Sequence, residues 1–300
     1  MSEIQARTFT DLLSPALLSE LRRIELKTRR AINTDLIGNY RSAFKGSGLV
    51  FSDLREYIAG DDVKHIHWKV TARTGKAYVK SFEEDRQQRV VVAVDISNST
   101  NHGVPKTKHL KALEFAAVIS MLAQQSHDQL GLCLFSNHIE EFFPPTHSRR
   151  QFQKVMLSLL KHRQLAAATD LKASISEFLK QQRRPSIVFL VSDFLAPPFE
   201  PELRLLARRH DLICVLLEDS FAASVPRAGI TEFQDAESGK TVLLDTSSPG
   251  VRRHLEALQR KRVENFQESC RLAGADFMRI EEGTLRPLAD LMHRRHARAH

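Results

Sequence analysis

The chain has 300 residues, of which 42% are hydrophobic and 27% are charged, so its composition excludes a disordered tail or a fibre. No stretch approaches the ~18 consecutive apolar residues that a membrane-spanning helix requires. The N-terminus lacks the basic-then-apolar layout of a secretory signal, so we expect a cytoplasmic protein.

Cysteine usage agrees with this location. Cys133, Cys214 and Cys270 are scattered singly, two of them within apolar runs, which is typical of buried thiols in a reducing compartment. The formal net charge is +8, but the basic excess lies at the two ends, and residues 90–250 carry equal numbers of acidic and basic side chains. Because the excess positive charge is small and divided between the two ends, it does not favour nucleic-acid binding, which is the weakest of the functional alternatives.

The first part of the chain contains two segments with different sequence patterns. Residues 12–36 carry apolar side chains at intervals of three and four, which predicts one amphipathic helix. Residues 40–86 are irregular and rich in Gly, Asp and aromatic residues, and they end in a strand-like piece at 77–84. We therefore expect an N-terminal segment over residues 1–86 that contains a helix and an irregular β-containing extension.

From residue 89 the pattern becomes regular, which predicts a second unit over residues 87–300. Continuous apolar runs at 89–95, 130–135, 186–193, 211–217 and 275–280 predict strands buried on both faces, and 139–143 is placed to form a hairpin with 130–135. Helical periodicity falls between them, at 107–126, 148–162, 170–182, 200–209, 251–272 and from about 284; a further short strand is expected at 241–245. This alternation predicts an α/β fold, a doubly wound and mostly parallel sheet with helices on both faces.

Ligands of such sheets bind beyond the carboxyl ends of the strands, where this chain places short oxygen-bearing side chains. Asp95, Ser97 and Ser99 follow the first buried strand, Asp193 follows the strand at 186–193, and Thr169 precedes the helix at 170. Carboxylate and hydroxyl oxygens are hard ligands suited to Mg²⁺ or Mn²⁺. Taken singly, each residue also fits an ordinary helix cap or turn, so the metal interpretation depends on all three loops meeting at one edge.

The set Asp95-x-Ser97-x-Ser99, Thr169 and Asp193 resembles the metal-ion-dependent adhesion site of von Willebrand factor A domains. The upstream motifs, from Gly46-Ser47-Gly48 through Gly60-Asp61-Asp62 to Ile66-His67-Trp68 and Ala72-Arg73, resemble the signature of the bacterial domain-of-unknown-function family 58. The resemblance implies a von Willebrand A-like fold, a magnesium ion held by those five residues, and a client protein that donates an acidic residue to the metal. It also implies a MoxR-type AAA+ ATPase as partner, with the chain acting as an adaptor or co-chaperone in client maturation.

The segment between Arg55 and Arg73 has two interpretations. Glu56, Asp61, Asp62, His65 and His67 are a conceivable second metal cluster, but a turn whose acidic residues pair with Arg55 and Arg73 is favoured. Its functional interpretation is a partner interface, because Arg, Tyr and Trp are typical of interaction hot spots. The residues assigned to this interface are Arg55, Tyr57, Asp61, Asp62, Trp68 and Arg73.

No catalytic constellation is evident in the sequence. The chain has no Gly-x-x-x-x-Gly-Lys-Ser/Thr loop, and Ser97 and Ser99 have no histidine in a recognisable motif. We expect a protein-binding role without enzymatic activity. The alternative is a Mg²⁺-dependent phosphoesterase, since one metal with two carboxylates can support phosphoryl hydrolysis.

Overall fold

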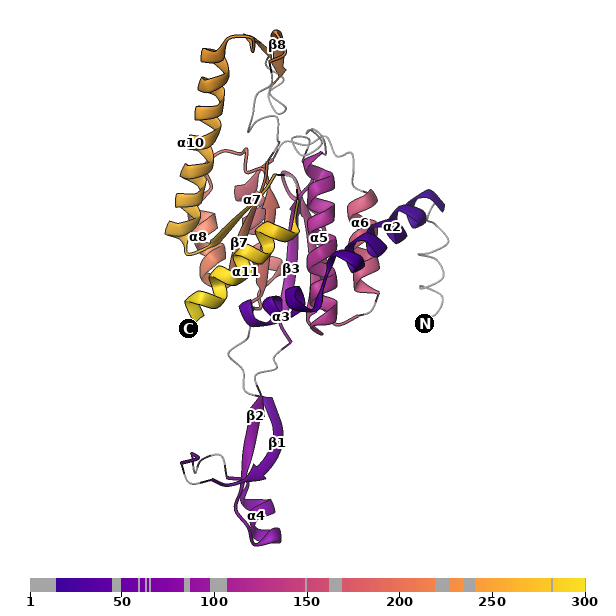
Figure 1. Cartoon of the computed structure of the whole chain (residues 1–300), viewed down its shortest axis with the longest axis vertical. Coiled ribbons are helices and arrows are strands. Elements are labelled where there is room, and N and C mark those ends of the chain that lie inside the picture. Colours follow the sequence, from indigo (N-terminus) through magenta and orange to yellow (C-terminus); the bar gives the residue numbers. More distant parts are fainter. Residues whose placement is uncertain are drawn as a thin grey trace.

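A six-stranded sheet forms the centre of the computed structural model, which describes residues 15–44, 50–58, 60–62, 64, 66–83, 87–97, 107–148, 150–161, 169–218, 227–234, 241–281 and 283–299 (Figure 1). The strand order is β10 (Asp276–Ile280), β7 (Asp211–Leu217), β6 (Ile187–Ser192), β3 (Arg89–Asp95), β4 (Gln129–Phe135) and β5 (Ile139–Thr146). Neighbouring strands run parallel except β5, which pairs with β4 as the predicted antiparallel hairpin. The order reverses at β3, so the sheet is doubly wound and the predicted fold class is confirmed.

Helices cover both faces of this sheet. One face carries α5 (Lys108–Gln125), α6 (Gln151–Lys161) and α11 (Leu285–Ala299), and the other carries α7 (Leu171–Gln181), α8 (Glu200–Arg209) and α10 (Pro249–Ala273). Side chains of β3 alternate between the two cores, with Val90, Val92 and Val94 in the first and Val91 and Ala93 in the second. Burial on both faces explains why this strand reads as an uninterrupted apolar run.

The prediction of a single helix over residues 12–36 is wrong. The chain forms α2 (Pro15–Ala31) and α3 (Thr34–Ala43), and Asn33 separates them. The Asn33 side chain accepts a hydrogen bond of 2.9 Å from the Leu36 amide, so it caps α3 and the helix restarts in a new direction. The break lets Tyr40 and Phe44 enter the core beside α5 and α11, which periodicity alone does not reveal.

A hairpin arm extends away from the sheet (Figure 1). It consists of β1 (Val50–Glu56) and β2 (Tyr78–Glu83), paired antiparallel, with the short helix α4 (Trp68–Thr74) between them. The strand expected at 77–84 corresponds to β2. The domain boundary predicted between residues 86 and 87 lies next to residues 84–86, which are outside the described part of the chain, so the domain division stays a prediction. Helices α2 and α3, which belong to the predicted N-terminal segment, pack on the core of the central sheet.

Two strands were missed by the sequence analysis: β1, within the segment expected to be irregular, and β8. Strand β9 (Thr241–Asp245) was expected, but it pairs with β8 (Ile230–Gln234) as a separate two-stranded sheet outside the central one. These strands are short and largely exposed, so the sequence has no continuous apolar run that would predict β8. Across the described part of the chain, none of the helices has the length and apolar content needed to cross a bilayer.

Candidate functional site: an acidic cluster at the carboxyl edge of the sheet

Four of the five predicted metal ligands converge at the carboxyl edge of the sheet. Asp95 ends β3, Ser97 follows it, Asp193 follows β6 and Thr169 precedes α7. The Thr169 hydroxyl donates a 2.7 Å hydrogen bond to the Ser97 hydroxyl, which links two loops 72 residues apart. All four side chains are buried, with Asp95 and Asp193 completely so. The fifth predicted ligand, Ser99, lies outside the described residues.

The Asp95 carboxylate is held by two local donors. Its Oδ1 atom accepts a bond of 2.9 Å from the Ser97 amide, and its Oδ2 atom accepts one of 2.6 Å from the Ser192 hydroxyl. Burial, followed by the negative charge of Asp193, raises the pKa of Asp95 to about 6, although the bonds from Ser192 and Ser97 oppose the shift. Burial of the Asp95 carboxylate is thus the main cause of its raised pKa, and the charge of Asp193 adds to it.

Asp193 carries a counter-ion that the sequence analysis did not assign. The Lys108 ammonium lies 2.6 Å from Asp193 Oδ2, and the Leu195 amide donates to Oδ1 at 3.1 Å. The Lys108 side chain is only 11% exposed, and Lys108 is the first residue of α5, directly after the N-cap residue Thr107. A lysine in a first helical turn opposes the helix dipole, so its burial there is compensated by Asp193.

A second buried carboxylate–cation group borders this edge. Glu218, directly after β7, accepts a bond of 2.9 Å from Gln259 Nε2 and forms an ion pair of 3.0 Å with Arg279. Its backbone carbonyl accepts a bond of 2.6 Å from the buried Lys111 ammonium. Arg262 donates at 3.0 Å to the backbone carbonyl of Asp193; burial lowers its pKa, while Asp193 and Glu218 oppose the shift. The edge is thus a dense arrangement of opposite charges.

The donor set fits a hard divalent cation. Asp95, Asp193, Ser97 and Thr169 supply carboxylate and hydroxyl oxygens only, which is the chemistry Mg²⁺ and Mn²⁺ prefer. Two residues at this edge were not among the predicted site residues. Ser192 was visible as the last residue of its strand, whereas a lysine opening an apolar helix was the only sequence signal for Lys108.

The arm residues lie apart from the sheet edge (Figure 1). Arg55 forms two bonds with Asp61, of 2.7 and 2.6 Å, and this pairing lowers the pKa of the Asp61 carboxyl. The expected second pairing is not found: Arg73 makes no ion pair with any described residue. The Asp62 carboxylate accepts a bond of 2.9 Å from the Lys64 amide, as in a turn.

Two aromatic residues of the arm, Tyr57 and Trp68, are exposed to solvent. Trp68 is 66% exposed and Tyr57 is 38% exposed, so neither packs into the core of the sheet. His67 caps α4 by accepting a bond of 3.3 Å from the Val70 amide, and His65 lies outside the described residues. These two aromatic side chains are therefore accessible on the arm, and their role in an interface stays a prediction.

Comparison with known proteins gives one family and several fold neighbours. The family model described as "Protein of unknown function DUF58" matches residues 53–265. Uncharacterized proteins of Mycobacterium bovis and Mycobacterium tuberculosis are 31% identical over 234 residues, which is 76% of this chain and 74% of theirs.

Two solved structures are similar in fold. BatB from Bacteroides thetaiotaomicron has 15% identity and a TM-score of 0.41, covering 69% of this chain and 98% of that one. The SpRpn10 VWA domain has 12% identity and a TM-score of 0.33, covering 70% and 95%. At these scores the fold assignment depends on the strand order and not on the neighbours. The family match confirms the resemblance in the upstream motifs, and the chain belongs to the DUF58 family.

Proposed function

We propose that this chain is a protein-interaction adaptor whose binding edge is the carboxyl edge of the central sheet. Asp95, Ser97, Thr169 and Asp193, together with Ser99, would hold Mg²⁺ or Mn²⁺ there. The bound metal would supply a Lewis-acid position for an acidic side chain of the partner. A MoxR-type AAA+ ATPase acting on a client protein is the proposed setting.

The convergence of the four oxygen ligands is the observation that carries the proposal. They come from three separate loops, and the bond between Thr169 and Ser97 brings two of these loops together. A helix-cap role for each residue separately does not require that convergence. Asp95 and Asp193 in particular are both completely buried, and the charge of Asp193 raises the pKa of Asp95; a divalent cation would stabilise these two negative charges.

The residues of the proposed site have different electrostatic and positioning roles. Asp95 and Asp193 provide negative charge, while Ser192 and the Ser97 amide fix the orientation of the Asp95 carboxylate. Lys108 neutralises Asp193, so it provides positive charge at the same edge. None of these roles needs a nucleophile or a proton transfer, so the proposal assigns no catalytic step.

The test compares the wild-type chain with Asp95→Ala, each in Mg²⁺ and in EDTA. The first readout is Mn²⁺ binding by electron paramagnetic resonance, and the second is recovery of partners from native lysate, identified by mass spectrometry. Asp290→Ala, which changes an exposed carboxylate on α11, is the matched control. We expect Asp95→Ala to lose Mn²⁺ binding and the partner, and Asp290→Ala to keep both.

Two results would contradict the proposal. Recovery of the same partner by both chains, with and without Mg²⁺, would move the interface to the arm or to the basic ends of the chain. Hydrolysis of p-nitrophenyl phosphate that EDTA and Asp95→Ala both abolish would replace the adaptor by a phosphoesterase.

A further inference from the structure

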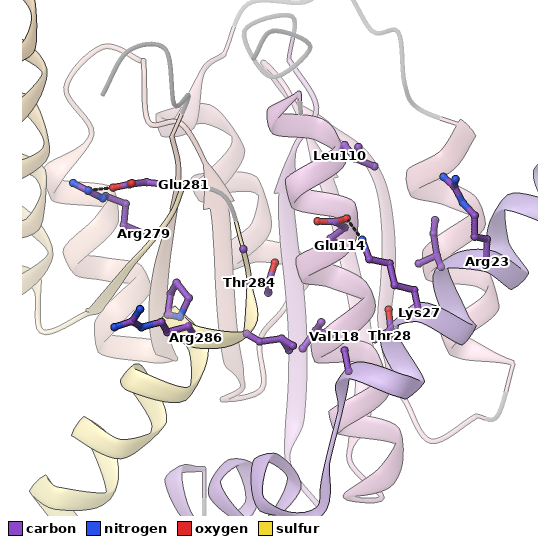
Figure 2. A pocket seen from close by; sticks show the side chains of 15 residues that line it. Arg23, Lys27, Thr28, Leu110, Glu114, Val118, Arg279, Glu281, Thr284 and Arg286 are labelled. Atoms are coloured by element: carbon purple, nitrogen blue, oxygen red, sulfur yellow. Dashed lines mark hydrogen bonds and ion pairs between the residues drawn. The ribbon is translucent and has the colours of Figure 1, made fainter. Parts of the chain in front are cut away.

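A groove of about 1000 Å³ lies between α2, α5 and the connection from β10 to α11 (Figure 2). Three segments far apart in sequence line it, within residues 23–31, 110–118 and 279–287. None of the four described candidate metal ligands lines it. Among the described lining residues, Arg279 connects the groove to that edge, because it also pairs with Glu218.

The floor of the groove is apolar. Leu110 and Val118 of α5 are eight residues apart and share one helix face, Ile24 contributes from α2, and Leu285 and Pro287 contribute from the start of α11. Ile24 and Val118 are buried, so the floor of the groove is continuous with the packed core. A surface of this kind matches the apolar stripe of an amphipathic helix.

The walls of the groove are basic. Arg23 and Lys27 stand on the α2 side and Arg279 and Arg286 on the opposite side (Figure 2). The two acidic lining residues are already engaged, since Glu114 pairs with Lys27 at 2.7 Å and Glu281 pairs with Arg279. Arg23 and Arg286 are exposed and make no ion pair within the described part of the chain. Among the described residues, the groove therefore offers two guanidinium groups without an acidic partner, one on each side of an apolar floor.

We propose that this groove binds an amphipathic helix of a partner protein, with acidic residues on both flanks of its apolar stripe. The apolar stripe contacts the floor, and the acidic flanks face Arg23 and Arg286. Charge complementarity on both sides of the floor favours this occupant over a neutral or basic helix. Binding here uses no metal, so this surface is independent of the proposed function at the sheet edge.

The test uses the full chain in EDTA and fluorescence anisotropy. The probe is a labelled helical peptide of about 18 residues, about five turns long, with leucine at positions i, i+3, i+4 and i+7 and glutamate on both flanks. A second peptide has lysine in place of glutamate. We expect the acidic peptide to bind in the micromolar range and the basic peptide to bind at least tenfold more weakly.

Variants assign the binding to the groove. Arg23→Glu combined with Arg286→Glu reverses the charge at both positions, and we expect it to weaken binding of the acidic peptide at least tenfold. The matched control, Arg22→Glu with Arg204→Glu, makes the same change in net charge at exposed positions that do not line the groove, and should stay within about twofold. Circular dichroism of each variant checks that the fold is kept.

Three outcomes would overturn the proposal: no binding of the acidic peptide, equal loss in both double variants, or equal affinity for both peptides. Binding of oleate or inorganic phosphate that depends on Arg23 and Arg286, without peptide binding, would assign the groove to a small anion instead. Asp95→Ala should leave peptide affinity unchanged, so failure at the metal edge and failure in the groove are distinguishable.

Discussion

Lys108→Met is the substitution that most directly tests the electrostatics of the sheet edge. The Lys108 ammonium lies 2.6 Å from the Asp193 carboxylate, with the lysine side chain 11% exposed and Asp193 fully buried. Removing one partner of a buried ion pair leaves the other charge uncompensated, which costs about 3–5 kcal/mol. We therefore expect the free energy of unfolding to fall by about 3 kcal/mol, the lower end of that range, in EDTA at pH 7.5.

The same substitution should have the opposite effect on metal binding. Lys108 provides positive charge where a divalent cation would also be attracted to Asp193, so its removal should raise the affinity for Mn²⁺ by about tenfold or more. A ligand at one hundred times its Kd stabilises the folded state by about 2.7 kcal/mol. Saturating Mg²⁺ should therefore restore most of the stability that Lys108→Met loses in EDTA.

Urea denaturation in EDTA and in Mg²⁺ measures the first effect, and Mn²⁺ titration followed by electron paramagnetic resonance measures the second. Lys172→Met is the matched control, because Lys172 also lies in a first helical turn, in α7, but is exposed. It should change stability by less than about 0.5 kcal/mol. If Lys108→Met leaves both the stability in EDTA and the Mn²⁺ affinity at their wild-type values, the electrostatic account of the edge is refuted.

Two further predictions concern stability away from this edge. Burial, followed by the charge of Arg209, lowers the pKa of His210 to about 4, so the unfolded chain binds a proton first as pH falls below about 6.5. Between pH 6.5 and pH 4, the free energy of unfolding of the wild-type chain should fall by up to about 3 kcal/mol because of this residue. His210→Leu should remove that part of the pH dependence measured by urea unfolding. The same pH dependence in both chains would contradict the lowered pKa. The buried Tyr40 hydroxyl donates to Asp128 at 3.1 Å, so Tyr40→Phe should lower the unfolding free energy by about 1–2 kcal/mol in urea, whereas the exposed Tyr57→Phe should not change it measurably. Equal effects of these two substitutions would refute the role of the buried bond.

The arm shows where sequence reasoning reached its limit. The residue types of Arg55, Tyr57 and Trp68 indicated an interface, but whether these residues pack on the sheet or face solvent could not be predicted from one sequence. The structure turns Trp68 outward, and the pairing of Arg55 with Asp61 stabilises the turn beside it. No local pattern specifies the exposure of Trp68, because exposure depends on which other elements pack against the arm.

The central sheet was predictable because burial on both faces imposes a continuous apolar run on each parallel strand. Val90 to Val94 and the run at 211–217 had no other simple interpretation, and their alternation with helices predicted the doubly wound order. Helix ends were less predictable. The break at Asn33 depends on one side chain capping a new helix, and the apolar period runs across it.

The sequence by itself determined the fold class, the family and the acidic edge at which Asp95 and Asp193 meet. These follow from local patterns and from the rule that parallel strands end at a common edge. Only the tertiary structure decided that Lys108 faces Asp193 and that Arg23 and Arg286 flank one groove. Those contacts join residues 85 positions apart in the first case and separate helices in the second. Such pairings are set by how helices pack on the sheet, and the spacing of residues along the chain does not encode them.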